Sequence, residues 1–435
     1  MTECTQSEFA FPSCKSRKVS VDFQGGNISS LGGSLLLSQA DRQLDLLRKA
    51  AGLIPDPRKQ KMITHKLEHM LRQRVFAIAC GEEDLNDHEE LRRDIALQTA
   101  VGTDKVLASA STLCRLENRA QRQAAFDLNA LFVEQFIASH KTPPKEIVLD
   151  FDATDDAVHG NQEGRFFHGY YDQYCFLPLY VFCDSQLLCA YLRPSKIDGA
   201  KHAWAILSLL TKRLRSEWPD VKIIFRGDSG FCRWKMLRWC DRNHVDYIIG
   251  LAKNSRLIAI GADLISDAQT RFEQTGEKQR LFDEFEYAAS TWDRKRRVII
   301  KAEHSAMGSN PRFVVTSLAG DPQELYDGMY CPRGNMENRI KEQQLDLYAD
   351  RTSCHKWWAN QFRLLLSSLA YILLEHIRRI ALKNTRLAHA TSATIRNKLI
   401  RIGAVVLKNT RRIRLHLSSA CPHQELFALA ASRLE

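Results

Sequence analysis

The stretch EIVLDFDATDDAVHG, residues 146–160, indicates the fold, because an apolar strand runs directly into a group of carboxylates. These belong to Asp150, Asp152, Asp155 and Asp156. Alternate side chains of a strand share a face, so Asp150 and Asp152 are expected to point the same way. Like charges this close raise one another's pKa. We therefore expect a cation to bind here, and we expect Asp155 and Asp156 to cap the following turn.

Composition places the chain among ordinary soluble proteins. It has 435 residues, 44% hydrophobic and 26% charged, which suits two or three domains. The net charge of +11 does not by itself indicate a nucleic-acid partner. Residues 391–417, however, contain several Arg and Lys and no acid, which predicts either a surface facing a polyanion or a solvated helical face. No apolar run is long enough for a membrane span and no secretory signal is visible, so we expect a cytoplasmic protein.

The N-terminal third is mostly helical in pattern. Short strands broken by glycines are expected at 18–37, and helical periodicity follows from Asp41 to about His140. Residues 102–119 resemble a helix-turn-helix, from which Arg115 and Arg119 would reach DNA. We therefore predict a DNA-binding domain in residues 1–140.

After a Pro-containing hinge the hydrophobic period changes from that of a helix to that of a strand. Three antiparallel strands, a helix, a strand, a second helix and a final strand are then expected in succession. This order predicts an α/β fold with a ribonuclease-H-like mixed five-stranded sheet and flanking helices. The predicted parts are the catalytic domain in 141–253 and 329–380, a β-strand insertion domain in 254–328, and a basic helical C-terminal region in 381–435.

Two further acids, Asp228 and Glu337, are candidates for the same site as Asp152. Asp228 comes directly after the apolar strand 221–225, so it lies beside Asp152 if the two strands are neighbours. Glu337 is expected in the first turn of a helix whose buried stripe is Met336, Ile340 and Leu347. Three carboxylates suit two Mg²⁺ ions, an arrangement that supports in-line phosphoryl transfer.

Several motifs together carry a family resemblance. Tyr330-x-x-Arg333-x-x-x-Glu337 matches a signature around the third acid, GDSGF matches the second-acid block, and DFDATDD…HG matches the first. FQGGNISSLGGSLLL and CGEEDLNDH in the N-terminal part fit the same group. Over about residues 20–380 the chain resembles the bacterial insertion-sequence DDE transposases, specifically the thirteen-eighty group.

The resemblance implies a function and its residues. Asp152, Asp228 and Glu337 would be catalytic and would hold Mg²⁺, with Mn²⁺ able to substitute, while Asp150 supports them. Such an enzyme binds the inverted repeats of its element, nicks double-stranded DNA with water and joins the 3′-hydroxyl to target DNA. A homodimer on DNA is implied as well.

The resemblance also implies contacts to the DNA backbone, from Tyr330 and Arg333. The signature usually has a lysine seven residues after the glutamate, but that position is Gln344 here. Lys341 lies four residues after Glu337, and positions i+4 and i+7 share a helix face, so Lys341 is expected to meet a phosphate instead.

The insertion of related transposases carries a tryptophan that stacks on a flipped base. Trp292, in the basic segment TWDRKRR, is the candidate here, with Arg294, Arg296 and Arg297 meeting the backbone. A tryptophan of the protein core is the alternative interpretation of Trp292.

Two alternative functions, a phosphatase and a DNA-binding regulator, fit part of the sequence. IVLDFDAT also matches the motif of haloacid-dehalogenase-like phosphatases, in which Asp150 would be the nucleophile and Asp152 the general acid. That family needs an acid where this chain has Cys232, and its motif is not followed by a β-hairpin. A DNA-binding regulator without catalysis would leave Asp228 and Glu337 unexplained.

Overall fold

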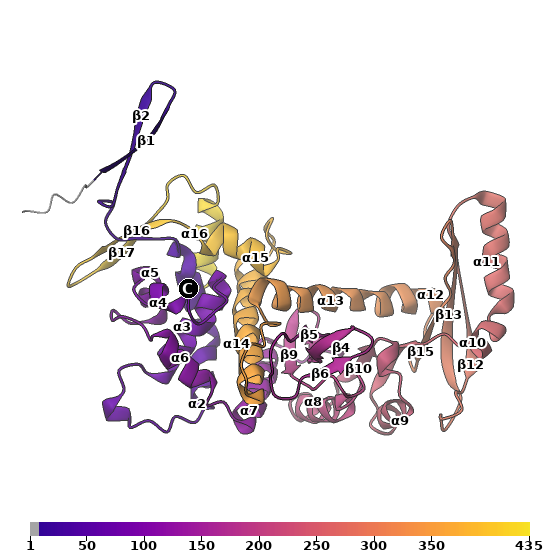
Figure 1. Ribbon diagram of the computed structural model, residues 1–435. Coiled ribbons are helices and arrows are strands. Elements are labelled where there is room, and N and C mark those ends of the chain that lie inside the picture. Colours follow the sequence, from indigo (N-terminus) through magenta and orange to yellow (C-terminus); the bar gives the residue numbers. More distant parts are fainter. Residues whose placement is uncertain (1–7) are drawn as a thin grey trace, which may run out of the picture. The chain divides into compact units, whose positions relative to one another are not determined.

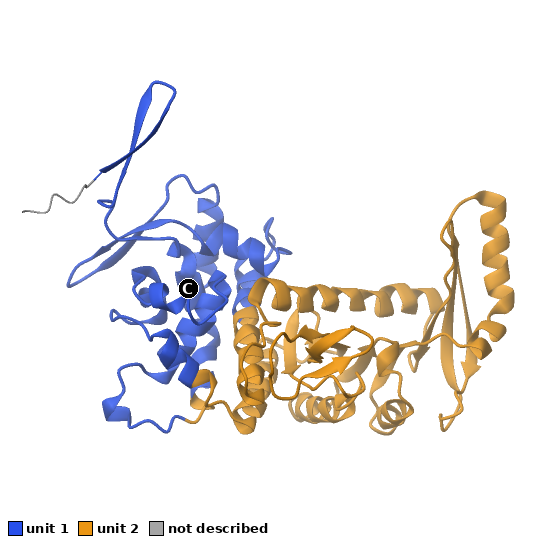
Figure 2. Ribbon diagram, viewed as in Figure 1, with its two compact units in different colours: residues 1–51, 56–115, 373–435 blue, residues 52–55, 116–372 orange. Residues whose placement is uncertain are grey.

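The structure is a computed structural model that describes residues 8–435 and divides into two compact units (Figures 1 and 2). The first unit combines the chain up to Ala51 with Asp56–Arg115 and Leu373–Glu435. The second comprises Gly52–Pro55 and Leu116–Ile372. Among the described residues, no helix is both long and apolar enough to cross a membrane.

The second unit is built on a mixed nine-stranded sheet. Its strands follow the order β12-β13-β15-β11-β10-β4-β8-β9, and β14 pairs with the free part of β13. Only β4, β10 and β11 run parallel to one another, and all other pairs are antiparallel. The strands are β4 Glu146–Ala153, β8 Leu179–Cys183, β9 Gln186–Tyr191, β10 Lys222–Gly227, β11 Asp246–Leu251, β12 Gln279–Tyr287, β13 Arg296–Ser305, β14 Gly308–Ser309 and β15 Arg312–Thr316.

Helices cover both faces of this sheet, which explains why its central strands are apolar throughout. Phe151 of β4 and Phe225 of β10 belong to a large core together with helices α8 and α9. Ile224, Ile248 and Tyr326 belong to a smaller core on the other side. The helices of this unit are α7 Arg122–Ala138, α8 Ala203–Glu217, α9 Trp234–Arg242, α10 Ser255–Ile260, α11 Ala262–Thr275, α12 Pro322–Glu324, α13 Gly334–Lys341 and most of α14 Trp357–His376.

The five strands expected for the catalytic domain lie next to one another, in the order β9-β8-β4-β10-β11. The expected sheet was nevertheless too small, because β15, β13 and β12 of the predicted insertion extend the same sheet beyond β11. The insertion also holds helices α10 and α11, which the sequence pattern did not reveal. Its alternating charged and apolar residues belong to strands of this shared sheet.

The helix that carries Glu337 begins earlier than expected. Helical structure is continuous from Pro322 to Asp346, through π-helical turns at Leu325–Tyr330 and Glu342–Asp346 and a 3₁₀ turn at Cys331–Arg333. Glu337 is therefore in its middle. The predicted buried stripe of Met336, Ile340 and Leu347 is confirmed.

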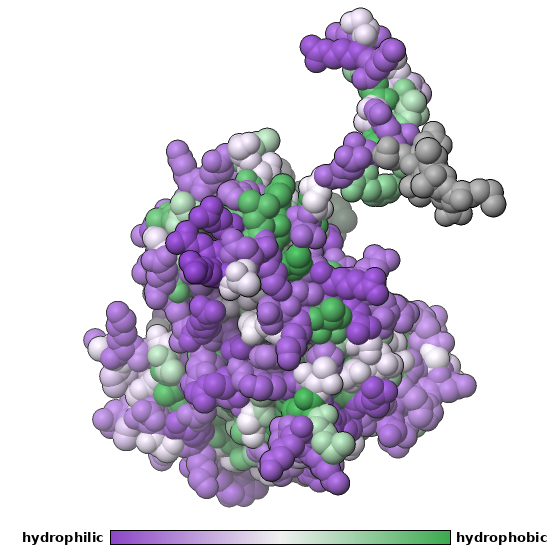
Figure 3. Space-filling model, turned by 90° about the vertical axis from the view of Figure 1, so that its left-hand side faces the viewer, coloured by the Kyte–Doolittle hydropathy of each residue, from purple (hydrophilic) through white to green (hydrophobic). Residues whose placement is uncertain are grey.

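The first unit is helical with two small sheets. Its helices are α1 Leu35–Leu44, most of α2 Leu46–Gly52, α3 Leu67–Cys80, α4 His88–Leu91, α5 Ile95–Val101, most of α6 Ala110–Glu117, α15 Ser392–Ile395 and α16 Gln424–Arg433. One sheet is the hairpin of β1 Glu8–Cys14 and β2 Arg17–Asp22, and the other joins β3 Ile28–Ser29 to β16 Ala404–Lys408 and β17 Ile413–Leu417. Figure 3 shows the β1–β2 hairpin at its top, with hydrophobic and hydrophilic side chains both exposed.

Two local predictions for this unit were wrong. Residues 35–37 begin helix α1 instead of a strand, and the C-terminal region contains the strands β16 and β17 as well as helices.

The paired glycines of SLGGS have a packing role, because a Cβ on Gly33 would come within 1.8 Å of the carbonyl oxygen of Leu399. Backbone this close tolerates only glycine.

Phe151→Ala is expected to destabilise the second unit by about 3–5 kcal/mol, because it leaves a cavity in a close-packed core. The Phe151 ring is fully buried, with its centroid 4.9 Å from that of Phe225. Urea unfolding followed by tryptophan fluorescence measures this unit alone, since all seven tryptophans lie in it. Phe167→Ala is the control: its exposed ring predicts a change below about 1 kcal/mol, and equal losses would contradict the assignment of the core.

Candidate active site

Asp152 and Asp228 lie side by side at the carboxyl edge of the sheet. Strands β4 and β10 are parallel neighbours, and Phe151 pairs in register with Gly227, so the residue after each is an aspartate. Asp228 Oδ1 accepts a hydrogen bond of 2.9 Å from the amide of Gly230, which caps the 3₁₀ turn Ser229–Phe231. This pairing confirms the predicted adjacency of the two strands.

Arg333 brings the third acid to the same place. Its guanidinium donates through Nη2 to Oε1 of Glu337 at 2.6 Å and through Nη1 to Oδ2 of Asp152 at 3.4 Å. Arg333 and Glu337 are four residues apart and so share a face of α13. One side chain thus joins two carboxylates that are 337 − 152 = 185 positions apart in the sequence.

The electrostatics of this group follow from its burial. The pKa of Asp152 is raised to about 7, chiefly by burial; Arg333 opposes the rise, and the negative charges of Asp228 and Glu337 contribute to it. The side chain of Asp152 is 15% exposed, whereas that of Glu337 is 45% exposed. The group is therefore short of positive charge at its buried end.

Asp150 has a different environment from Asp152. It is buried and forms a two-pronged ion pair with Arg226 of β10, one contact being Nη2 to Oδ2 at 2.7 Å. Arg226 also donates to the carbonyl oxygen of Met329 at 2.5 Å, which attaches the helix of Glu337 to the sheet. A carboxylate held in this way is poorly placed to act as a nucleophile, and a supporting role for Asp150 stays a prediction.

Gly250 of β11 provides space for the second acid and for Tyr330. A Cβ at this position would lie 2.6 Å from the Tyr330 hydroxyl and 2.9 Å from the amide nitrogen of Ser229. Burial raises the pKa of Tyr330, Arg333 opposes this, and the charge of Asp228 adds to the rise. Tyr330 is therefore near both Asp228 and Arg333.

The residues after Glu337 do not behave as expected. Lys341 is exposed, whereas Gln344 turns inward and donates 2.9 Å hydrogen bonds to the carbonyl of Asp155 and to Oδ1 of Asp156. The two positions differ because a π-helical turn begins at Glu342 and changes the face that follows. Lys341 as a phosphate contact stays a prediction, but the reason given for it, a shared face with position 344, was wrong.

Asp155 and Asp156 do not cap a turn as expected. Asp156 is fully buried in the short strand β5 (Asp156–Ala157), and Asp155 accepts a 2.6 Å hydrogen bond from Gln173. Burial raises the pKa of Asp156 well above its usual range, opposed by the hydrogen bond from Gln344.

In the insertion, the predicted DNA contacts have partners within the protein. Trp292 is half-buried, with its ring 5.7 Å from that of Tyr287 and with Arg296 over its face. The three arginines form ion pairs: Arg294 with Asp241, Arg296 with Asp241 and Asp293, and Arg297 with Glu284. A structural role for Trp292, the alternative raised from the sequence, agrees with this packing, and contact with DNA stays a prediction.

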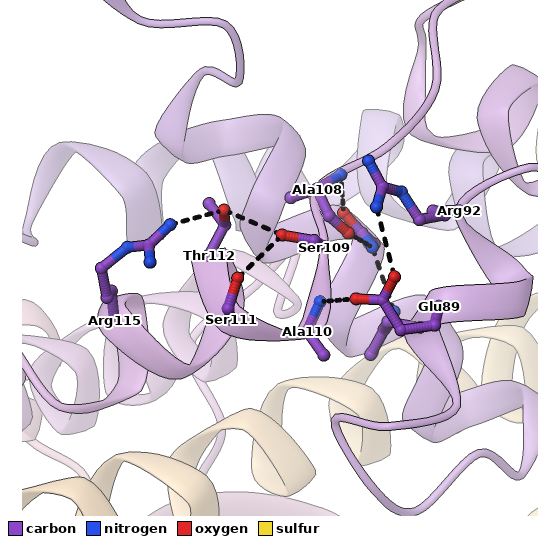
Figure 4. A network of polar contacts seen from close by, with 10 residues as sticks. Glu89, Arg92, Ala108, Ser109, Ala110, Ser111, Thr112 and Arg115 are labelled. Atoms are coloured by element: carbon purple, nitrogen blue, oxygen red, sulfur yellow. Dashed lines mark hydrogen bonds and ion pairs between the residues drawn. The ribbon is translucent and has the colours of Figure 1, made fainter.

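The candidate recognition helix of the N-terminal part is α6, which begins at Ala110. Figure 4 shows how its start is held: Glu89 accepts a 2.9 Å hydrogen bond from the amide of Ala110, and Arg115 donates to Thr112 at 2.9 Å. Arg115 is exposed and Arg119 is half-buried just beyond the helix. A helix-turn-helix within 102–119 would need a short first helix before α6, and that helix is absent. Residues 102–109 separate α5 from α6, which is more than the three or four residues of a usual helix-turn-helix.

A metal ion suits the donors of this site, though not their present positions. In residues 8–435 no three metal-type ligands are close enough together to hold an ion. Asp152, Asp228 and Glu337 nevertheless offer only carboxylate oxygens, which hard divalent cations prefer, and the buried end of the group lacks positive charge. A bound cation would compete with Arg333 for Asp152 and Glu337.

The family of the chain is established by comparison with known proteins. The family model described as "Transposase DDE domain group 1" matches residues 11–435, so the chain belongs to this family of DDE transposases. The family implies an enzyme that cuts and transfers DNA strands and uses divalent metal ions. No curated protein matches the chain.

Among solved structures, the chain is similar to the piggyBac transposase in a cryo-EM synaptic complex with hairpin DNA. That match has 11% identity and a TM-score of 0.45, and covers 92% of this chain and 81% of the other.

Family membership removes the phosphatase alternative, and the ion pair of Asp150 with Arg226 gives the physical reason. Sequence reasoning had missed Arg226 and Gly250. The signal for Arg226 was a single charge inside an otherwise apolar strand, IIFRG, which demands a buried partner. Gly250 within the strand pattern DYIIGL indicates a close approach by other atoms.

Metal-free protein is expected to lose stability as the pH rises from about 4 to about 7. The pKa of Asp152 is raised in the folded state, so folding favours the protonated form, and the advantage vanishes once the folded carboxyl ionises. The loss would be up to about 4 kcal/mol at 1.36 kcal/mol per pKa unit. Urea unfolding in EDTA at several pH values measures the free energy of unfolding against pH. Asp152→Asn should flatten this dependence, and Asp220→Asn, which alters an exposed acid, should not. An unchanged pH dependence in Asp152→Asn would contradict the assignment of the raised pKa to Asp152.

Gly250→Ala is expected to reduce DNA-strand cleavage at least tenfold, because its methyl group displaces Tyr330 and the backbone beside Asp228. A stability loss of about 1–3 kcal/mol should accompany it, as for other overpacked sites. The control is Gly328→Ala, since no atom lies within 4 Å of a Cβ built there. Cleavage assays together with urea unfolding test this, and full activity in Gly250→Ala would show that the close approach is not needed.

Proposed function

We propose that this protein is the transposase of an insertion sequence of the thirteen-eighty group, with a ribonuclease-H-like catalytic domain. It would bind the inverted repeats of its own element, cleave the ends and join the freed 3′-hydroxyls to target DNA. The observation that carries the proposal is the ion pair of Arg333 with both Asp152 and Glu337, beside Asp228. It gathers acids from three separate parts of the chain at one edge of the sheet, in a member of the DDE family.

The chemistry is two displacements at phosphorus. In the first, a water oxygen forms a bond to phosphorus and loses a proton to solvent, while the bond from phosphorus to the 3′-oxygen breaks and this oxygen takes up a proton to become the 3′-hydroxyl. In the second, this 3′-oxygen loses its proton to solvent and forms a bond to a phosphorus of the target, while the bond from that phosphorus to the target's 3′-oxygen breaks and the target strand leaves as a protonated 3′-hydroxyl. Asp152, Asp228 and Glu337 would hold Mg²⁺ or Mn²⁺, which supplies activation of the attacking oxygen and stabilisation of the leaving oxygen.

The other residues of the site have roles that follow from their positions. Arg333 would release the carboxylates when a metal ion binds and then pair with a DNA phosphate, which guanidinium groups bind well. Tyr330 lies near both Asp228 and Arg333 and would position the same phosphate group. Asp150 and Arg226 hold the helix of Glu337 on the sheet.

Binding of the DNA ends is assigned to exposed basic residues of the first unit. Arg115 on α6 is exposed, as are Arg411, Arg412 and Arg414 in the β16–β17 hairpin and its turn. These side chains would meet phosphates, a contact that is sensitive to salt. Both ends of an element must be processed together, so we propose that a homodimer acts on DNA.

The test uses a labelled duplex that carries one end of the element containing the gene, incubated with Mg²⁺ or with EDTA. We expect Mg²⁺-dependent cleavage that leaves a 3′-hydroxyl at the element end. Asp152→Asn, Asp228→Asn and Glu337→Gln should each reduce it at least a hundredfold. Asp150→Asn should leave part of the activity. Asp220→Asn should leave all of it, because this exposed acid precedes the amino end of β10, the opposite end of the strand from Asp228.

Two results would contradict the proposal. One is cleavage that persists in EDTA at the same rate. The other is equal loss in Asp150→Asn and Asp152→Asn, together with phosphatase activity of the unaltered protein on a small phosphate ester.

A further inference from the structure

A short hairpin next to the first acid exposes an unusual set of aromatic rings. It consists of β6 Phe166–His168, β7 Gln173–Phe176 and the turn between them, and we call residues 165–176 the aromatic hairpin. Phe167 is 53% exposed, Tyr174 48% and Tyr170, in the turn, 85%. Phe167 and Tyr174 face each other across the two strands with ring centroids 5.7 Å apart, so they share one face of the hairpin.

Cations accompany these rings. The Arg165 guanidinium lies 4.6 Å from the centre of the Tyr174 ring, and the Lys196 ammonium lies 4.4 Å from the centre of the Phe166 ring. The segment RFFHGYYDQY contains no Leu, Ile, Val or Met, so its apolar surface consists of aromatic rings. Alternating rings and cations are typical of surfaces that bind single-stranded nucleic acid.

Direct contacts tie the aromatic hairpin to the acids. Strand β7 pairs with β5, and Gln173 donates a 2.6 Å hydrogen bond to Asp155, three residues after Asp152. The pKa of Tyr171 is raised to about 12, chiefly by burial, with smaller contributions from the negative charges of Asp155 and Asp152. The Tyr171 ring is therefore close enough to these two carboxylates to interact with them. The hairpin therefore stands beside the strand that carries the first catalytic acid.

The base of the hairpin is firmly packed while its outer face is exposed. Phe176 contacts Trp357 with ring centroids 5.3 Å apart, and Ser195 donates a 2.7 Å hydrogen bond to the carbonyl oxygen of Phe166. A Cβ on Gly164 would come within 2.5 Å of the Trp357 ring, so the chain enters the hairpin pressed against that ring. Rings on a fixed support lose little freedom on stacking, which favours binding.

We propose that the aromatic hairpin binds unpaired nucleobases of a DNA strand next to the cleaved phosphate. Phe167, Tyr170 and Tyr174 offer the stacking surfaces, and Arg165 meets the backbone. Base faces in intact duplex are covered by neighbouring bases, so the site selects melted or frayed ends. Asp172 in the turn repels phosphates, so the rings contribute most of the affinity. The inference rests on the proposed function, because it requires that the protein act on DNA.

The test is a binding titration with the full chain in EDTA, which prevents cleavage. The probes are a fluorescein-labelled 15-nucleotide oligo(dT), a single strand that forms no duplex, and a labelled 30-base-pair duplex. The variant is Phe167→Ala/Tyr170→Ala/Tyr174→Ala. Stacking is worth about 1–3 kcal/mol per base, so its Kd for oligo(dT) should rise at least tenfold, while its Kd for duplex stays within twofold.

Two controls show that stacking is the cause. Tyr174→Phe keeps the ring and should bind oligo(dT) like the unaltered protein. Phe9→Ala/Phe11→Ala removes exposed rings from the β1–β2 hairpin, which belongs to the other compact unit, and should also leave oligo(dT) binding unchanged. Urea unfolding of the triple variant, followed by tryptophan fluorescence, should match that of the unaltered protein because the removed rings are exposed.

The outcomes separate this inference from the proposed function. If the triple variant binds oligo(dT) as tightly as the unaltered protein, the inference is overturned. The same holds if the unaltered protein cleaves the duplex but does not bind oligo(dT), in which case the proposed function stands. If the unaltered protein binds neither probe and cleaves nothing, both fail. If the substitutions change only the molar mass in solution, the hairpin contacts a second copy and the inference is again overturned.

Discussion

Two arginines allow several carboxylates, which would otherwise repel one another, to lie together at a buried edge of the sheet. Arg226 compensates Asp150, and Arg333 compensates Asp152 and Glu337. The same side chains attach the helix of Glu337 to the sheet, Arg226 through the carbonyl of Met329 and Arg333 through Asp152. Removing either arginine would leave an uncompensated buried charge, which typically costs 3–5 kcal/mol. Charge compensation and placement of the third acid thus depend on the same contacts.

The extended sheet gives this edge its rigidity. Because β15, β13 and β12 continue beyond β11, the strand bearing Gly250 is an interior strand with partners on both sides. Its backbone is therefore fixed where it supports Ser229 and the Tyr330 ring. The arginines of the insertion pair with acids of the same unit, so the basic stretch 294–297 also stabilises the sheet. Positive charge in a sequence does not by itself reveal a surface for DNA.

The sequence predicted the parts of the fold that depend on local pattern. Apolar runs ending in Asp152 and Asp228 revealed two parallel strands, and their register brings these residues together. The extension of the sheet could not be predicted in this way, because neither β12 nor β13 alternates cleanly between charged and apolar residues. Charged residues of β12 pair with both charged and apolar residues of β13, as Glu286 with Arg297 and Glu284 with Ile299. Asp156 was misplaced for a related reason: its burial depends on Gln344, which lies 188 residues away. Asp152, Asp228 and Glu337 lie together as the sequence indicated, and their catalytic role stays a prediction. The sequence analysis missed the arginine in IIFRG that compensates the buried Asp150.

The π-helical turns on either side of α13 decide which side chains reach the acids. Each π turn adds a residue to one helical turn and so rotates everything after it by about 100° relative to a regular α-helix. The turn at Leu325–Tyr330 comes before Arg333 and Glu337, and Arg333 then contacts both Asp152 and Glu337. The turn at Glu342–Asp346 comes after them and directs Gln344 to Asp155 and Asp156, while Lys341 stays in solvent. In this chain the helix therefore contacts the segment of the first acids twice, through Arg333 to Asp152 at the carboxyl edge of the sheet and through Gln344 to Asp155 and Asp156 next to the aromatic hairpin.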